Sequence, residues 1–232
     1  MNTKEELFKN LSTQNGGKII LLLLDGLGDL ELNGKTPLES AVKHNINKLT
    51  PKSILGLSIP IFEGITPGSG PAHLSLFGYD PIKYQIGRGV LEAHGGALHL
   101  EKNQVAIRGN FATIKNGIVT DRRAGRIPTA QNKRLCEKLT NKIKKIKDVK
   151  IDIYPVKEHR IVIILTGENL GDNLTDADPQ MQVPPAVIAK ARDDKSKITA
   201  EIIKEFTLNV QNILEDEPKA NSILLRGFSH LP

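Results

Sequence analysis

Cysteine, tryptophan and long apolar runs are scarce in this sequence of 232 residues. The single cysteine, Cys136, excludes a disulfide within the chain, and no cluster of Cys and His has the spacing of a structural zinc site. One reduced cysteine fits a cytoplasmic setting. The longest apolar run, residues 19–24, is too short to cross a bilayer, and residues 1–17 are too polar for a secretory signal. We therefore expect neither export nor a membrane partner.

Aromatic residues are also rare, at 4% of the chain. This argues against binding of single-stranded nucleic acid, because such surfaces stack bases on exposed aromatic rings. The 32 Lys and Arg residues outnumber the 26 Asp and Glu residues and give a net charge of +6. That surplus favours anionic partners without choosing among phosphorylated metabolites, nucleic acid and membranes, and it also arises on solvated surfaces that bind nothing.

The first third of the sequence has the pattern of an α/β sheet. Residues 18–24 are continuously apolar and end at Asp25, which is typical of a strand buried on both faces. Thr36 followed by proline and an acid predicts a helix N-terminus, with the helix running to about His44. Residues 53–58 predict a second short strand. A turn-rich loop, residues 66–71, then leads into an apolar helical turn.

Beyond residue 88 the pattern changes to that of an α+β or α/β domain. Residues 105–114 alternate between apolar and polar side chains like a half-exposed strand, and residues 118–121 resemble its hairpin partner. The lysine-rich run 142–147 alternates with isoleucine, so we interpret it as the solvated face of a helix with its apolar positions packed inward. The remaining predicted elements are a helix at 129–147, strands at 149–154 and 160–165, a helix at 197–214 and a strand at 222–225.

Two residues of the first third could carry chemistry. Asp25 follows the predicted buried strand, where the carboxyl end of a parallel sheet opens to ligands, although an aspartate there also commonly caps a turn. Ser69 lies between two glycines at a predicted helix start, so its hydroxyl could face a site or simply cap the helix. A serine becomes a good nucleophile only when a base or a metal lowers its pKa.

Arginines dominate the candidate residues of the second part. Arg122, Arg123 and Arg126 fall within six residues beside a predicted hairpin end, which suits recognition of phosphate or carboxylate, although a solvated basic turn is the alternative. Arg108 lies inside an alternating strand, so it is either exposed at an edge or directed into a cleft. His159 and Arg160 follow a glutamate at the start of another predicted strand.

Taken together, these segments resemble the archaeal-type, cofactor-independent phosphoglycerate mutases of the alkaline phosphatase superfamily. The matching stretches occur in the family's order across nearly the whole chain. They are residues 24–29 (LDGLGD), 66–69 (TPGS), 72–81 (AHLSLFGYDP), 108–113 (RGNFAT), 121–126 (DRRAGR), 158–160 (EHR), 175–179 (TDADP) and 224–227 (LLRG).

The resemblance implies interconversion of 3-phosphoglycerate and 2-phosphoglycerate in glycolysis and gluconeogenesis, without a requirement for 2,3-bisphosphoglycerate. It implies that Asp25 and Ser69 bind a divalent metal, Mn²⁺, Mg²⁺ or Zn²⁺, and that Ser69 is the catalytic residue that accepts the phosphoryl group. A second, inserted domain would bind the substrate through Arg108, Arg122, Arg123, Arg126, His159 and Arg160.

Two departures from the family pattern qualify these expectations. The family commonly has an acid after the nucleophilic serine, where this chain has Gly70. The family's further metal ligands include an Asp-His pair, which this sequence lacks. We therefore expect residues 1–87 to be the N-terminal part of an incomplete alkaline-phosphatase-like parallel sheet domain and residues 88–232 to be the inserted α+β substrate domain.

The same shortage of ligands leaves the activity of the chain alone open. A second chain could supply the missing C-terminal part. The alternatives are a non-catalytic or partner-dependent phosphoglycerate-binding subunit and a metal-dependent phosphatase of the same superfamily. A nucleic-acid-binding protein is a distant third, because only the net charge favours it.

Overall fold

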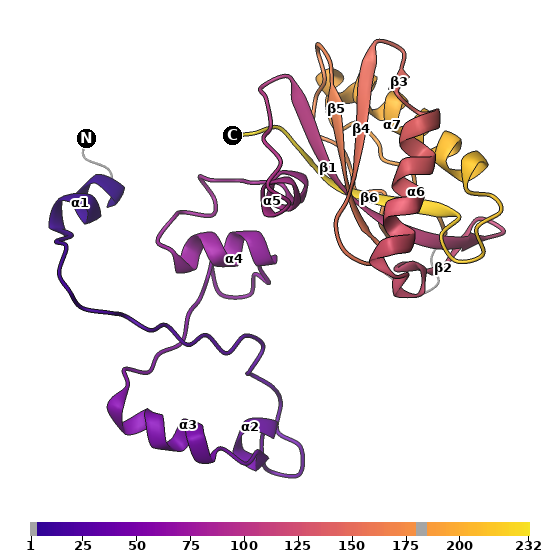
Figure 1. Cartoon of the computed structure of the whole chain (residues 1–232). Coiled ribbons are helices and arrows are strands. Elements are labelled where there is room, and N and C mark those ends of the chain that lie inside the picture. The colour runs from indigo at the N-terminus through magenta and orange to yellow at the C-terminus, as the bar shows by residue number, and fades with distance from the viewer. Residues whose placement is uncertain (1–3, 180–184) are drawn as a thin grey trace.

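A six-stranded antiparallel sheet organises the fold of the computed structural model, which describes residues 4–179 and 185–232 (Figure 1). Strand β1 (Gln104–Lys115) is central: β5 pairs along one edge, β6 and the short β2 along the other. The order on one side continues from β5 to β4 and β3. The other strands are β2 (Ile118–Asp121), β3 (Lys145–Ile146), β4 (Val149–Pro155), β5 (Arg160–Thr166) and β6 (Ser222–Ser229).

The hairpin of β1 and β2 forms where the sequence predicted it, but the half-exposed character predicted for residues 105–114 was wrong, since nearly all of them are buried. The two-residue loop of the hairpin is Asn116-Gly117, with φ of 50° and 74°. An Asn-Gly pair tolerates these positive φ values, and this turn matches the twist of antiparallel strands. Lys115 therefore pairs directly with Ile118.

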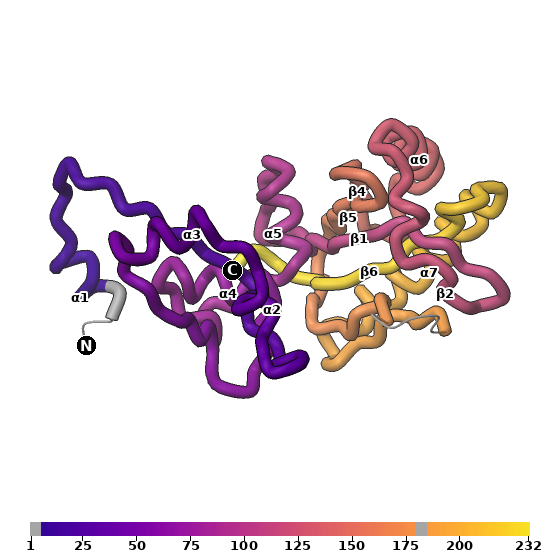
Figure 2. Tube along the Cα trace, turned by 90° about the horizontal axis from the view of Figure 1, so that it is seen from below, coloured from indigo at the N-terminus to yellow at the C-terminus, as the bar shows by residue number. Residues whose placement is uncertain are grey.

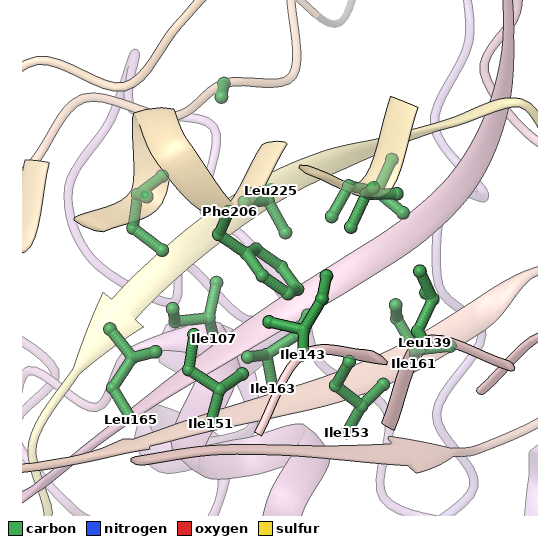
Figure 3. Close-up of a cluster of buried hydrophobic side chains, with 14 of the residues drawn as sticks. Ile107, Leu139, Ile143, Ile151, Ile153, Ile161, Ile163, Leu165, Phe206 and Leu225 are labelled. Atoms are coloured by element: carbon green, nitrogen blue, oxygen red, sulfur yellow. The ribbon is translucent and has the colours of Figure 1, made fainter. Parts of the chain in front are cut away.

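Two helices, α6 (Thr129–Lys142) and α7 (Lys197–Ile213), cover one face of the sheet. Their buried side chains, among them Leu139 and Phe206, pack on isoleucines of the strands, as Figure 3 shows. Ile107 of β1 and Ile163 of β5 lie at the centre and are fully buried. This core makes the sheet a rigid support for whatever its other face carries.

On the other face of the sheet, two hydrophobic clusters lie at the two ends of β1. Helix α5 (Arg88–Gly95) packs through Val90 and Ala93 on Ala106 of β1. At the opposite end of β1, Ala112 packs with Val119 of β2 and Leu224 of β6. Arg108 and Asn110 lie between these two clusters on β1.

The chain before α5 lies to one side of the sheet and is largely exposed, as Figures 1 and 2 show. Within the described residues no position before Gly89 is buried. Its helices are α1 (Lys4–Leu11), α2 (Pro37–Ser40), α3 (His44–Leu49) and α4 (Ser69–Leu76), with a 3-10 turn at Thr50–Lys52. No helix of the described part of the chain is long and apolar enough to span a membrane.

The two strands predicted in the first third were wrong. Residues 18–24 and 53–58 are irregular, and the side chain of Ile19 is 97% exposed. A strand buried on both faces needs partners that accept its backbone hydrogen bonds, and no described residue pairs with either segment. The helix predicted from Thr36 does begin there, with a capping box between Thr36 and Glu39, but it ends at Ser40 and a separate helix follows.

The mixed α/β fold class and most predicted elements of the second part are confirmed. The helix predicted at residues 129–147 is shorter in the structure, where α6 ends at Lys142. The lysine-rich run therefore continues into β3 and does not form a helical face. Ile143 and Ile146 of that run are buried while the lysines between them are exposed, so the inward packing of the apolar positions is confirmed. The last strand, β6, extends four residues past the predicted end.

Candidate functional site

Polar side chains gather in the middle of the sheet on the face opposite the helices α6 and α7. Residues two apart on a strand share a face. Arg108 and Asn110 of β1 lie on this face, opposite the core residues Ile107 and Phe111. In the pairing register Arg108 lies across from Arg226 of β6, and Asn110 lies across from Arg160 of β5. Three neighbouring strands thus bring three arginines together.

The turn after β2 adds further arginines to this face. The carboxylate of Asp121 accepts hydrogen bonds from the backbone N–H groups of Arg123, at 2.8 Å, and Gly125, at 2.7 Å. These bonds stabilise a tight turn in which Ala124, Gly125 and Arg126 all have positive φ, between 49° and 62°. Residues other than glycine rarely adopt such φ values, so the backbone is strained at Ala124 and Arg126.

The arginines from the strands and the turn line one pocket with a volume of about 420 Å³. Every substrate-binding residue predicted from the sequence lines it, together with Asn110, Glu158 and Arg226. The predicted residues that the structure brings together are Arg108, Arg122, Arg123, Arg126, His159 and Arg160. We call the whole set the arginine pocket.

Two carboxylates hold four of these arginines. Glu92 of α5 forms ion pairs with Arg108, at 3.3 Å, and Arg160, at 3.4 Å. Asp178, whose side chain is fully buried, accepts hydrogen bonds from Nε and Nη2 of Arg122 at 2.9 and 2.7 Å, and its other oxygen lies 3.6 Å from Arg226. Each carboxylate therefore fixes one arginine relative to another.

Burial and mutual repulsion act on the charges in the arginine pocket. Burial lowers the pKa of Arg108, and burial together with the nearby charge of Arg108 lowers the pKa of Arg226. Burial also lowers the pKa of His159; Glu158 opposes this effect, and neighbouring arginines add to it. An anion in the pocket would relieve this repulsion and replace lost solvation.

Several polar atoms of the arginine pocket have no hydrogen-bond partner within the described part of the chain. They are Nε of Arg108, Oδ1 of Asn110, Nδ1 of His159 and Nε of Arg226. Buried polar groups are normally paired, so unpaired ones at a pocket suit a ligand or a rearrangement on binding. Together with six guanidinium groups, they suit a small molecule with more than one anionic group.

Asp25 and Ser69 lie outside the arginine pocket. Asp25 is exposed in a turn of the irregular N-terminal chain, and Ser69 is the exposed first residue of α4. Ser69 lines a separate, apolar pocket of about 380 Å³ with His73, Leu74 and Leu91 among its neighbours.

A metal ion at Asp25 and Ser69 would need further ligands. Among residues 4–179 and 185–232, no group of three or more His, Cys, Asp or Glu side chains could hold a metal ion. Asp25 and Ser69 alone do not satisfy the coordination of a divalent cation, so the described residues do not fit a metal centre.

Sequence reasoning missed three members of the site. Arg226 carries the same signal as Arg108, because it is an arginine inside an otherwise apolar strand, and Asn110 is two residues from Arg108 on the same face. Glu92 carried no such signal, since its role depends on how α5 packs on the sheet.

The comparisons with known proteins agree with one another. A family model described as 2,3-bisphosphoglycerate-independent phosphoglycerate mutase matches residues 51–220. A protein from Thermotoga maritima named "Probable 2,3-bisphosphoglycerate-independent phosphoglycerate mutase" is 52% identical over 232 residues, which are 100% of this chain and 58% of the relative. A protein of the same name from Thermus thermophilus is 45% identical and aligns with 97% of this chain and 56% of its own length. The chain thus spans little more than half the length of these curated relatives.

Two solved structures are similar in fold. A cofactor-independent phosphoglycerate mutase from Thermoplasma acidophilum has a TM-score of 0.59 and 29% identity, covering 69% of this chain and 46% of that one. The PH0037 protein from Pyrococcus horikoshii has a TM-score of 0.62 and 29% identity, covering 90% of this chain and 50% of that one.

Proposed function

Because the chain belongs to the 2,3-bisphosphoglycerate-independent phosphoglycerate mutase family, we propose that its arginine pocket binds 2- and 3-phosphoglycerate during their interconversion. The observation that carries the proposal is the convergence of six arginines from three strands and one turn on a single pocket. Phosphoglycerate bears a phosphate and a carboxylate on a three-carbon skeleton. Guanidinium groups bind both kinds of anion through paired N–H donors.

The internal support of the arginines favours a binding site over a solvated basic surface. Arg108 and Arg226 lose hydration in the pocket, which has a free-energy cost that a solvated surface would not require. Glu92 and Asp178 offset part of this cost by pairing with four of the arginines. Arg123 pairs with neither of them, and Arg126 makes a single long ion pair, 3.6 Å from Glu158, so both can bind a ligand. A pocket with excess positive charge and prearranged donors is what recognition of a dianion requires.

For the phosphoryl transfer itself, we propose Ser69 as the acceptor. Its oxygen would bond to phosphorus as the bond between phosphorus and the substrate oxygen breaks, and the phosphoserine would then return the group to the other hydroxyl of the bound glycerate. A divalent metal, Mn²⁺, Mg²⁺ or Zn²⁺, if held by Asp25 and Ser69 together with further ligands, would supply the positive charge that lowers the pKa of a serine hydroxyl. The described residues offer only Asp25 and Ser69 toward such a metal.

Other parts of the proposal follow from family membership. The metabolic role would be in glycolysis and gluconeogenesis, in the cytoplasm, without 2,3-bisphosphoglycerate. We also propose a domain boundary near residue 88, which the onset of burial at Gly89 supports. Residues 88–232 would then be the substrate domain and residues 1–87 part of the metal-binding domain.

A second candidate function is a phosphoglycerate-binding subunit that depends on a partner chain. The exposed apolar side chains of residues 19–24 favour it, since an apolar segment of this kind is normally covered. In that case the chain alone would bind phosphoglycerate without turnover, and a polypeptide carrying the rest of the Thermotoga maritima relative would restore activity.

Turnover assays separate these functions. The chain would be incubated with Mn²⁺ and 3-phosphoglycerate labelled in its phosphate, alone and with the complementary polypeptide, and 2-phosphoglycerate, free phosphate and protein-bound label would be measured. We expect 2-phosphoglycerate and label on Ser69 in the active mixture, and neither with Ser69→Ala. Release of phosphate without 2-phosphoglycerate would favour a phosphatase, and label on a histidine would overturn the role of Ser69.

A further inference from the structure

Arg88, the first residue of α5, is an exposed arginine that the site described above does not use. Its guanidinium lies beside the start of α4: a Cβ added to Gly68 would be 3.2 Å from Nη2 of Arg88. Gly68 is the N-cap of α4, and Ser69 is the next residue. The positive charge therefore lies close to the backbone that carries the proposed acceptor.

The backbone of the same residue lies at the rim of the arginine pocket. Gly227 directly follows Arg226 and has a φ of +64°, and a Cβ there would be 2.6 Å from Cβ of Arg88. Burial is the main cause of the lowered pKa values of Arg108 and Arg226, and the positive charge of Arg88 lowers both further. The side chain of Arg88 thus extends from the pocket rim toward Gly68, the residue before Ser69.

Helix α5 fixes this geometry from both sides. Its buried residues Val90 and Ala93 pack on the sheet, and Glu92 pairs with two arginines of the pocket. Leu91 faces α4: a Cβ on Gly70 would be 2.7 Å from Cδ1 of Leu91. One short helix therefore contacts both the binding pocket and the helix of the acceptor.

The guanidinium of Arg88 has no salt-bridge partner among the residues that the structure describes, whereas Arg108, Arg122 and Arg160 are each paired with a carboxylate. Its donors are available to an incoming anion. A phosphoryl group on Ser69 would be that anion. It would lie within reach of Arg88, because the flexible side chain of Arg88 places its guanidinium beside Gly68, the residue before Ser69.

We propose that Arg88 is a catalytic residue that binds the phosphoryl group as it moves between the arginine pocket and Ser69. This inference rests on the proposed function. In the transfer, the oxygen of Ser69 bonds to phosphorus, the bond from phosphorus to the glycerate oxygen breaks, and that oxygen takes the proton that the serine loses. A guanidinium at this point stabilises the negative charge on the transferring oxygens.

A phosphoserine placed at position 69 during translation tests the contact without requiring turnover. The readout is the NMR signal of the Arg88 Nε–H group, assigned by its loss in Arg88→Lys. We expect this signal to shift when phosphoserine replaces serine, because a hydrogen bond to a phosphate oxygen deshields the proton. Arg192, an exposed arginine before α7, is the internal control and should not shift. An unchanged Arg88 signal would overturn the proposal.

Calorimetric titration with 3-phosphoglycerate separates this inference from the proposed function. We expect Arg88→Gln to leave Kd within about twofold, and Arg123→Gln to raise it by about tenfold or more, since only the second removes a pocket contact. Equal losses would place Arg88 in the binding site and contradict its role in transfer. If neither variant nor the unmodified chain responds to the ligand, the proposed function itself fails.

Discussion

Replacing Asp178 by alanine should be among the most destabilising single changes in this protein. Its side chain is fully buried and contacts two arginines, with bonds of 2.9 and 2.7 Å to Arg122 and a contact of 3.6 Å to Arg226. Removing one member of a buried ion pair costs about 3–5 kcal/mol, because it leaves charge buried without compensation. Arg122 keeps 30% of its side chain exposed, so water can reach it after the substitution. We therefore expect a loss near the lower limit, about 3 kcal/mol.

Urea unfolding followed by circular dichroism measures this loss. With a typical slope of about 2 kcal/mol per M, a loss of about 3 kcal/mol lowers the midpoint by about 1.5 M. Asp216→Ala is the matched control, because Asp216 pairs with Lys138 at 2.8 Å while its side chain is 75% exposed. Such surface pairs contribute about 0–1 kcal/mol. Equal midpoints for Asp178→Ala and Asp216→Ala would refute the view that Asp178 anchors the arginine pocket.

Three further predictions concern the pocket and the core. Arg123→Ala and Arg126→Ala should each weaken binding of 3-phosphoglycerate far more than Lys144→Ala, because Lys144 is an exposed lysine outside the pocket; equal, small changes in calorimetric Kd would mean that the arginine turn is only solvated surface. Burial lowers the pKa of His159 below its ordinary value of 6.5. The unfolded chain therefore binds a proton at His159 more readily than the folded protein, and the free energy of unfolding falls as the pH drops below 6.5. His159→Gln should remove this loss, and an unfolding free energy with the same dependence on pH from 7.5 to 5.5 in both proteins would contradict it. Burial raises the pKa of the Cys136 thiol to about 12, so iodoacetamide should modify Cys136 only in the unfolded chain, as mass spectrometry would detect; rapid modification under native conditions would contradict the burial.

The second part of the fold could be predicted from the sequence because its signals are local. The apolar patterns of residues 105–114 and 118–121 predicted the hairpin of β1 and β2 without reference to the rest of the chain. The run at residues 18–24 gave an equally strong signal and was misread, because a strand forms only when partners accept its hydrogen bonds. The periodicity of apolar residues predicts which side chains should be buried, but it does not identify the segments that cover them.

The candidate site was predicted in composition but not in organisation. The arginines stood out because Arg108 interrupts an apolar strand and Arg122, Arg123 and Arg126 cluster at a turn. Their grouping depends on strand register, which places Arg226 across from Arg108, and on contacts between segments distant in sequence, such as Asp178 with Arg122. No spacing rule in one sequence specifies such pairs.

Calorimetric titration of the purified chain with 3-phosphoglycerate, glycerate and inorganic phosphate tests the central claim, that the arginine pocket binds phosphoglycerate, most directly. We predict one site per chain and tighter binding of 3-phosphoglycerate than of either fragment, because the pocket holds both anionic ends. Arg226→Ala should weaken that binding by about tenfold or more, since it removes a buried guanidinium contact. Arg134→Ala, which removes an arginine outside the pocket, should leave it unchanged. Equal affinity for 3-phosphoglycerate and inorganic phosphate, or equal affinity in both variants, would contradict the account.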